Sequence, residues 1–111
     1  MQSVLVRPQT AIIRPQEYLN AANASEFQNQ LTCAMASEQN AALLIDMSTV
    51  ESLDSAGLMA LVATLRLAQK LNKRFALCAV SAPIRIVFEL TQLDRVFEIF
   101  DSAAAFELTI A

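Results

Sequence analysis

The middle of the chain reads Leu44-Ile45-Asp46-Met47-Ser48-Thr49-Val50-Glu51-Ser52-Leu53-Asp54-Ser55-Ala56-Gly57-Leu58. The apolar run over residues 42–45 ends in Asp46 and is typical of a strand buried on both faces of a sheet. A polar loop over residues 47–54 follows, and a helix is expected to begin at Ser55. The predicted core face of that helix has the spacing i, i+3, i+4, i+7 and comprises Leu58, Leu61, Val62 and Leu65. A buried strand followed by an amphipathic helix indicates an α/β fold.

Strand-like and helix-like segments alternate on both sides of this stretch. Further strands are predicted over residues 4–6, 11–13, 75–80 and 96–100. Further helices are predicted over about 23–38, from Ser81 through Phe88, and over 103–106. The order is β-β-α-β-α-β-α-β-α, which predicts a mixed, mostly parallel sheet with right-handed crossovers. The leading strand pair is expected to add an antiparallel or edge element.

Several helix starts carry capping signals. Asn23 and Glu26 have the spacing of a capping box. Pro83 suits a first helical turn, and Asp101-Ser102 can cap the last helix. Ser55 stands where the N-cap of the central helix is expected, so its hydroxyl could accept a hydrogen bond from a backbone N–H of the first turn.

Composition narrows the chemistry that the chain can perform. Its 111 residues, 55% hydrophobic and 17% charged, predict a single domain over residues 1–111 with one sizeable core. The chain has no His and one Gly, which excludes His-based triads, His-ligated metals and glycine-rich phosphate loops. The net charge of −3 lacks the basic excess of a nucleic-acid binder. We therefore expect no cofactor, no metal, no nucleic-acid partner and no catalytic residue.

The apolar segments are too short for a membrane protein. A spanning helix needs roughly 20 apolar residues, and the N-terminal residues lack the basic start and long apolar run of a signal peptide. We expect no membrane partner and a cytoplasmic location. In a reducing compartment, Cys33 and Cys78 are expected to be small buried hydrophobes.

The quoted stretch resembles the signature of the STAS domain, in the segments Leu44–Ser48 and Leu53–Leu58. This domain is shared by bacterial anti-sigma factor antagonists and the cytoplasmic ends of sulphate-type transporters. The resemblance covers nearly the whole chain and includes residues 93–97 after the third helix. Pro15-Gln16 and Gln92-Leu93 stand where antagonists often have glycine, so these loops are expected to differ in shape. Because no transporter portion is present, the stand-alone regulator is the better match.

The resemblance implies a phosphorylation switch at Ser55. In the antagonists, the Ser of the Asp-Ser pair is phosphorylated by a partner that is both a serine kinase and an anti-sigma factor. The unphosphorylated form binds this partner, and a PP2C-type phosphatase resets the switch. The simpler interpretation of Ser55 is a helix cap alone. Ser48, Thr49 and Ser52 are ordinary loop hydroxyls, and nothing in the sequence singles out one of them as a second phosphorylation site.

The start of the central helix is also the predicted docking surface. Asp54 is expected to be a recognition element for the kinase, and Gly57 would let another molecule approach closely. Met59 and Ala63 share an apolar flank near Ser55, unless another helix covers it. The predicted partner-binding residues are Asp54, Ala56, Gly57, Met59, Ala60 and Ala63.

Asp46 is predicted to shape the loop by accepting hydrogen bonds from backbone N–H groups. The alternative is a Mg²⁺ site like that of a receiver domain, in which Asp46 and Asp54 would take part. Such a site would need more converging carboxylates.

Two other functions use the same stretch. A module that senses a nucleotide or another small molecule would need a pocket beneath the Ser55 loop. A hydrolytic enzyme with Ser55 as nucleophile is disfavoured, because the chain has no His and the loop has no Lys to act as a base.

Overall fold

The computed structural model describes residues 9–110, so the strand predicted over residues 4–6 lies outside the described residues. Its main sheet has four parallel strands in the spatial order β1-β3-β5-β6. These are β1 (Gln9–Ile13), β3 (Asn40–Asp46), β5 (Arg74–Cys78) and β6 (Glu98–Phe100). The mostly parallel α/β sheet is confirmed. β1 is the edge strand of the described sheet, and it runs parallel to β3 where an antiparallel pair was one of the expectations.

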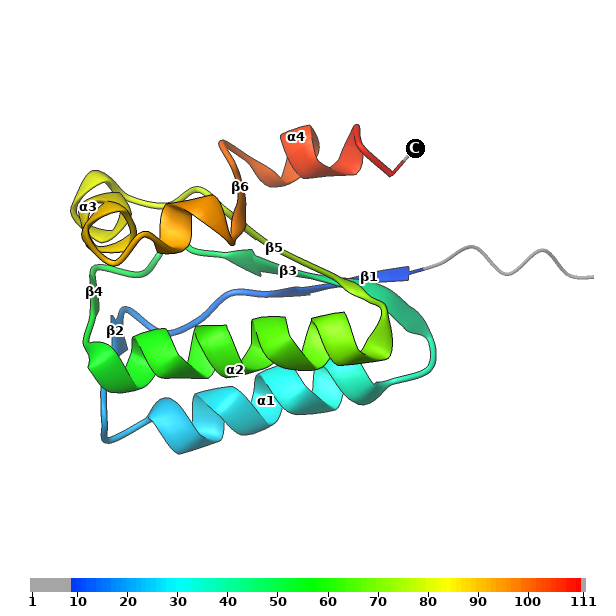
Figure 1. Ribbon diagram of the computed structural model, residues 1–111, viewed down its shortest axis with the longest axis horizontal. Helices are drawn as coiled ribbons and strands as arrows, with labels where there is room; N and C mark the ends of the chain where they lie inside the picture. The colour runs from blue at the N-terminus through cyan, green and yellow to red at the C-terminus, as the bar shows by residue number, and fades with distance from the viewer. Residues whose placement is uncertain (1–8, 111) are drawn as a thin grey trace, which may run out of the picture.

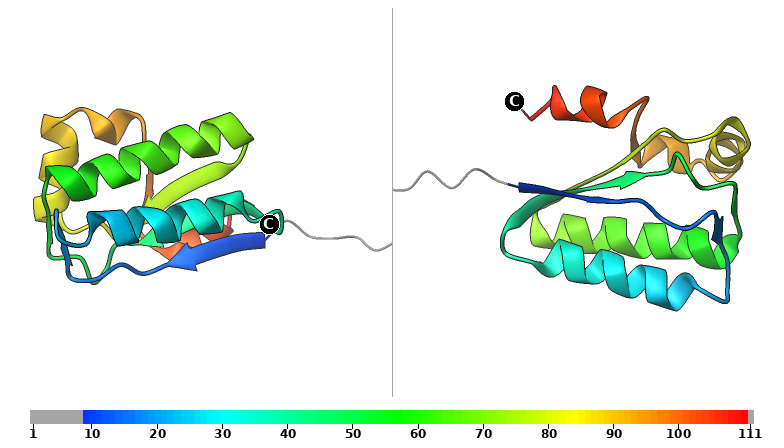
Figure 2. Two further views of the ribbon diagram at one scale, coloured as in Figure 1. Left: turned by 90° about the horizontal axis from the view of Figure 1, so that it is seen from below. Right: turned by 180° about the vertical axis from the view of Figure 1, so that it is seen from behind.

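Helices cover the two faces of the sheet unequally (Figures 1 and 2). The helices are α1 (Ala24–Ala36), α2 (Ser55–Leu71), α3 (Ala82–Leu90) and α4 (Ala103–Glu107), with a 3-10 turn η1 (Leu93–Arg95). The long helices α1 and α2 lie side by side on one face, and the short α4 lies on the other. α3 lies at the end of the molecule where α2 begins. Within residues 9–110, no helix is both long and apolar enough to cross a membrane.

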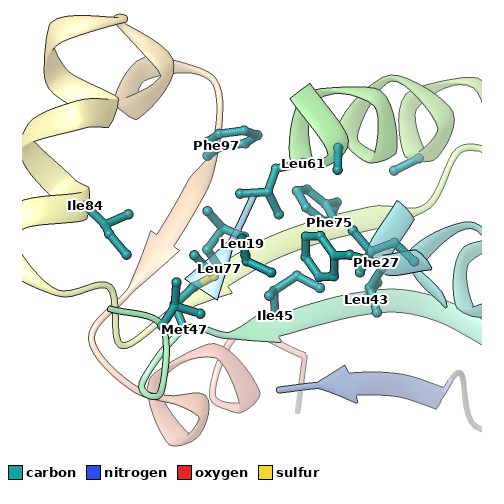
Figure 3. Close-up of a cluster of buried hydrophobic side chains, with 14 of the residues drawn as sticks. Leu19, Phe27, Leu43, Ile45, Met47, Leu61, Phe75, Leu77, Ile84 and Phe97 are labelled. Atoms are coloured by element: carbon teal, nitrogen blue, oxygen red, sulfur yellow. The ribbon is translucent and has the colours of Figure 1, made fainter. Parts of the chain in front are cut away.

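The central strand β3 is buried on both faces, as its continuous apolar run predicted. Leu43 and Ile45 belong to the core under α1 and α2, together with Phe27, Leu61 and Phe75 (Figure 3). Ala42 and Leu44 alternate with them and belong to the smaller core under α4. The strand therefore divides the hydrophobic interior into two layers.

The second layer depends on a single helical turn and one aromatic side chain. Phe106 of α4 is fully buried against Ala42, Leu44, Ala76 and Cys78. Its ring packs edge-on against Phe100 at 5.5 Å, and the Arg74 guanidinium lies 4.7 Å from its centroid. The Ser102 hydroxyl accepts a hydrogen bond from the Ala105 N–H at 3.1 Å, so the predicted cap of this helix is confirmed.

The buried face of α2 differs in part from the predicted one, although Leu61 is fully buried as predicted. The buried residues are Gly57, Ala60, Leu61, Thr64 and Ala68, whereas Leu58, Val62 and Leu65 are only half-buried. The helix is rotated so that its small residues face the interior, because α2 packs against α1 as well as the sheet and small side chains permit that approach. Thr64 is tolerated inside since its hydroxyl donates to the Ala60 carbonyl at 2.8 Å.

Three local predictions are wrong. β5 ends at Cys78, because Ala79 takes a left-handed φ of 56° that a strand cannot continue. Asn23 occupies the N-cap position of α1 but forms no capping box. Its amide instead holds the preceding turn, accepting from the Asn20 N–H at 3.0 Å and donating to the Tyr18 carbonyl at 2.6 Å. Cys33 is exposed on α1, whereas Cys78 is buried as expected.

Candidate functional site

The loop over residues 47–54 lies at the carboxyl ends of the parallel strands. Sheets of this kind usually bind their ligands and partners at that edge. The start of the loop is joined to the next strand by a hydrogen bond from the Met47 N–H to the Cys78 carbonyl at 2.9 Å. The Thr49 hydroxyl donates to the Pro15 carbonyl at 2.9 Å and ties the loop to the chain after β1. The loop is therefore held from both sides.

Asp46 shapes this loop as predicted. One carboxylate oxygen accepts from the Ser48 N–H at 3.0 Å, and the other accepts from Arg14 Nη2 at 2.9 Å. Burial by itself would raise the pKa of Asp46, but the hydrogen bonds from Ser48 and Arg14 outweigh it and lower the pKa below its ordinary value. Both oxygens are thus engaged in structural contacts. Within residues 9–110, no group of three or more His, Cys, Asp or Glu side chains is arranged to hold a metal ion.

The lowered pKa of Asp46 predicts a pH dependence of stability. A carboxyl group with a lowered folded pKa stabilises the protein above its unfolded pKa, near 3.8, and loses that contribution as the pH falls through the folded pKa. The Asp46→Asn variant should be less stable than wild type at pH 7 by about 1 kcal/mol, because it loses charge-assisted hydrogen bonds. The effect stays modest because the Arg14 side chain is 64% exposed and solvent screens the pair.

Urea unfolding between pH 2 and 7 measures this difference. The gap between wild type and Asp46→Asn should close below about pH 4, where Asp46 of the wild type becomes protonated. A gap that stays constant from pH 7 to pH 2 would contradict the role of the Asp46 charge.

A two-residue parallel bridge fixes the start of α2. β2 (Tyr18–Leu19) pairs with β4 (Ser52–Leu53), and the Asp54 N–H then donates to the Leu19 carbonyl at 3.0 Å. This bridge could not be predicted from the sequence, because two residues leave no detectable period. The bridge brings Tyr18 beside the loop, where it is 52% exposed. Hydrogen bonding to the Glu51 carboxylate raises the pKa of the Tyr18 hydroxyl.

The N-cap of α2 is Asp54, not Ser55. One oxygen of the Asp54 carboxylate accepts from the Ala56 and Gly57 N–H groups at 2.9 and 3.0 Å. The other accepts from the Ala21 N–H at 3.1 Å, in the turn before α1. Asp is as good a cap as Ser, and here it also holds a second segment of the chain.

Ser55 is consequently the first residue of α2, with its side chain exposed. Within residues 9–110, its hydroxyl takes part in no hydrogen bond. The capping role is excluded, since Asp54 fills it, and the hydroxyl is free for other chemistry.

Gly57 is needed by the fold and is not an open approach for a partner. A Cβ atom on Gly57 would lie 2.8 Å from Leu53 Cδ1 and 2.9 Å from both Cβ and the carbonyl oxygen of Leu19. These separations are shorter than carbon atoms tolerate, so β2 and β4 occupy the space that a side chain would require. The predicted close approach exists, but it is made by this chain itself.

The other predicted docking residues divide by exposure. Met59 is 55% exposed, and Ala56 and Ala63 are half-buried beside it. Ala60 is 1% exposed, so its side chain cannot meet a partner, and its inclusion in the docking surface is wrong. Because α2 turns its 57–60–64 row inward, the accessible flank near Ser55 consists of Ala56, Met59 and Ala63.

Two hollows of the described surface are lined by residues of β1, α1 and the chain between them. A cavity of about 90 Å³ opens between the end of β1 and α1, with Arg14, Gln16, Asn23, Glu26 and Gln30 among its lining residues. A wider hollow beside it is lined partly by the same side chains and reaches Cys33. Neither hollow is lined by the loop over residues 47–54 or by the start of α2. The pocket that a sensing module was expected to have beneath the Ser55 loop therefore does not coincide with either of them.

Comparison with known proteins gives a family match over most of the chain. The model of the STAS domain matches residues 2–105. A homologue of an anti-sigma factor antagonist from Thermotoga neapolitana is 30% identical over 91 residues, which are 82% of this chain and 80% of the relative.

Solved structures agree with this match. A Thermotoga maritima protein assigned as an anti-sigma factor antagonist superimposes with a TM-score of 0.83 and 26% identity, covering 91% of this chain and 86% of that one. The Bacillus cell fate determinant SpoIIAA, in its phosphorylated form, has a TM-score of 0.70 and 17% identity, covering 97% of this chain and 96% of that one. At this identity the second likeness establishes the shared fold alone.

Proposed function

The chain belongs to the STAS domain family, and we propose that it is a stand-alone anti-sigma factor antagonist in a partner-switching pathway. In this proposal it binds a protein serine kinase that is also an anti-sigma factor, and phosphorylation of Ser55 releases it. A PP2C-type phosphatase restores the binding form. The protein acts in the cytoplasm as a regulator, without catalytic residues or a cofactor of its own. The observation that carries the proposal is the exposed, unbonded Ser55 hydroxyl at the start of α2 beside the Asp54 carboxylate.

The position of Ser55 suits a group that must be modified without unfolding the domain. Its side chain points into solvent, and the cap of α2 is supplied by its neighbour. A phosphate on Ser55 would therefore break none of the contacts that hold the helix. Phosphorylation of Ser55 would thus leave the stability of the fold unchanged, and a reversible switch requires such independence.

The electrostatics of the site favour release after phosphorylation. A free helix N-terminus attracts anions, but here the Asp54 carboxylate already accepts from the Ala56 and Gly57 N–H groups. A phosphate adds about −1.5 to −2 charges at pH 7, directly beside that carboxylate. The new charge is left to solvent, so a partner docked over Ser55 would have to desolvate two adjacent anions. Repulsion and bulk therefore act on the partner complex more than on the free domain.

Variants of Ser55 test the switch. Ser55→Ala should keep the affinity of the kinase partner within about twofold and should no longer accept phosphate, whereas Ser55→Asp should bind at least about tenfold more weakly. Both variants should keep the wild-type melting temperature, because Ser55 neither caps α2 nor is buried. The partner is captured from native cells with Ser55→Ala, identified by mass spectrometry, and its affinity for each variant is measured by calorimetry.

The wild-type protein phosphorylated by its partner is the reference for full charge, because Asp carries about half the charge of a phosphate. Equal binding of the wild-type, Ser55→Asp and enzymatically phosphorylated proteins would refute the switch. A phosphate mapped to Ser48, Thr49 or Ser52 instead of Ser55 would move the switch to another hydroxyl of the loop.

The proposal also makes the exposed side chain of Met59 a contact for the partner. Met59 lies one helical turn after Ser55, and its flexible thioether suits an adaptable contact. Met59→Glu should weaken partner binding about tenfold or more, because it places a charge in an apolar contact. Its free energy of unfolding should stay within about 0.5 kcal/mol of wild type, since the site is on the surface.

The matched control is Leu71→Glu, at the other end of the same helix, where Leu71 is 40% exposed. Twelve residues separate the two positions, which corresponds to about 18 Å along the helix. Calorimetry with the captured partner should show a loss for Met59→Glu and none for Leu71→Glu. The reverse pattern would place the docking surface at the far end of α2.

A further inference from the structure

The outer side of α3 is an apolar stripe that nothing in the described chain covers. Ala82, Ile86 and Leu90 are spaced at i, i+4 and i+8, so they form one row along the helix, with Pro83 beside it. All four are exposed, Ile86 by 53% and Leu90 by 80%. This row faces away from the core, and none of its residues belongs to α2.

The orientation of α3 is fixed by its inner side. Ile84 is 2% exposed and Phe88 is fully buried, and both belong to the main core. The Phe88 ring packs edge-on against Phe97 with centroids 5.4 Å apart. The helix therefore cannot roll to bury Ile86 and Leu90 without withdrawing Phe88 from the core.

Two opposite charges flank the stripe. Arg85 and Glu89 stand four residues apart on the neighbouring row of the helix. Within residues 9–110 the ion pairs are Arg14–Asp46 and Arg74–Glu98, so Arg85 and Glu89 pair neither with each other nor with another described residue. The row therefore has an unpaired positive charge near its start and an unpaired negative charge near its end. An antiparallel second copy of α3 would place the opposite charge against each of them.

We infer that this stripe binds a second copy of the chain through antiparallel α3 helices. A two-fold axis near residues 87 and 88 places Arg85 of each protomer opposite Glu89 of the other, as an isologous contact requires. The same axis brings Ile86 and Leu90 of one helix against Leu90 and Ile86 of the other. A parallel arrangement would instead oppose like charges. The charge order along α3 therefore favours a copy of itself.

The size of the contact makes the dimer weak. A nine-residue helix is about 13 Å long, so two such helices cover far less than the roughly 1,200–2,000 Å² of a stable interface. We expect monomer and dimer to exchange with protein concentration. The stripe includes neither Ser55 nor any residue of α2, so this inference does not depend on whether Ser55 is a switch.

Sedimentation equilibrium of the whole chain over a wide concentration range tests the inference. Wild type should form a concentration-dependent dimer, and Leu90→Glu should weaken it at least tenfold. The matched control is Leu108→Glu after α4, because Leu108 is also 80% exposed and the variant adds the same charge. Leu108→Glu should dimerise as wild type does. Melting temperatures of both variants should equal that of wild type, since both side chains are on the surface.

Charge reversal tests the antiparallel register. Arg85→Glu and Glu89→Arg should each weaken self-association about tenfold, because each opposes like charges across the two-fold axis. An equimolar mixture of the two variants should regain the wild-type association, since each Glu then meets an Arg.

Three results would overturn the inference: a monomer at every concentration, a dimer that Leu90→Glu leaves intact, or a mixture no stronger than its components. Loss of binding to another protein by Leu90→Glu, with a wild type that is always monomeric, would assign the stripe to that protein.

Discussion

Replacing Phe106 by alanine should lower the free energy of unfolding by about 3–5 kcal/mol, although α4 is only five residues long. Phe106 is fully buried and is the side chain through which α4 covers Ala42, Leu44, Ala76 and Cys78. A five-residue helix has no stability of its own, so it is ordered by this packing. The variant loses the ring, its contact with Phe100 and the surface over which Arg74 lies.

Urea unfolding followed by circular dichroism measures the loss. Leu108→Ala, two residues further on, is the control: Leu108 is 80% exposed, so that variant should stay within about 0.5 kcal/mol of wild type. A thiol reagent gives an independent readout at Cys78, which is 1% exposed and whose pKa is raised by burial. Cys78 should react faster in Phe106→Ala. A loss below about 1 kcal/mol with an unreactive Cys78 would show that α4 is not needed to cover this face.

Asp54→Ala should lower the free energy of unfolding by about 2 kcal/mol, whereas Ser55→Ala should change it by no more than about 0.5 kcal/mol. The Asp54 carboxylate accepts hydrogen bonds from Ala56, Gly57 and Ala21, so its removal frays the start of α2 and releases the turn before α1. Ser55 contributes no such bond. Two neighbouring residues that are both good caps by type should therefore differ severalfold in effect.

Thermal and urea unfolding of the two alanine variants make this comparison, with Asp54→Ser as the control. Ser at position 54 can still cap α2 but has one oxygen, so it should recover part of the loss and leave the Ala21 N–H without its partner. If Ser55→Ala were less stable than Asp54→Ala, the N-cap of α2 would be Ser55 and not Asp54. Phosphorylation of Ser55 would then disturb the start of the helix.

Several features of the fold could be predicted because each has a local physical cause. The uninterrupted apolar run over residues 42–45 needs burial on both faces, and β3 has it. The alternation of strand and helix patterns allowed few topologies other than a parallel sheet. Ser102 was identified as a cap because a hydroxyl in that position, followed by an alanine-rich turn, has few other uses.

The candidate site was predicted in place but not in detail. The sequence located it at the end of the central strand and identified Asp46 as the residue that shapes the loop. It assigned the cap of α2 to Ser55 and partner recognition to Asp54, and the cap assignment is wrong. Both residue types cap helices equally well, so residue type alone could not decide between them. Which residue caps α2 depends on Ala21, which lies 33 positions from Asp54 in the chain. The Ala21 N–H donates to the Asp54 carboxylate oxygen that does not cap the helix.

Packing also decided which face of α2 is buried. Counting large apolar residues selected Leu58, Leu61, Val62 and Leu65. Leu61 is buried, but the helix also buries its small residues and leaves the other three half-exposed. Ala60 was consequently assigned to the surface and is buried. Hydrophobic periodicity reports that a helix has an inner face, and the space available between the elements decides which small side chains lie deepest.

The sequence by itself therefore determined the order of the helices and of the main-sheet strands from β1 to β6, the doubly buried central strand and the loop that precedes Ser55. These depend on contacts between near neighbours in the chain and on the period of apolar residues. Only the tertiary structure decided that Asp54 caps α2, that Gly57 is required by Leu19 and Leu53, and that Met59 but not Ala60 meets solvent. The physical reason is the two-residue bridge between β2 and β4, which joins segments more than 30 positions apart and leaves no pattern in either of them.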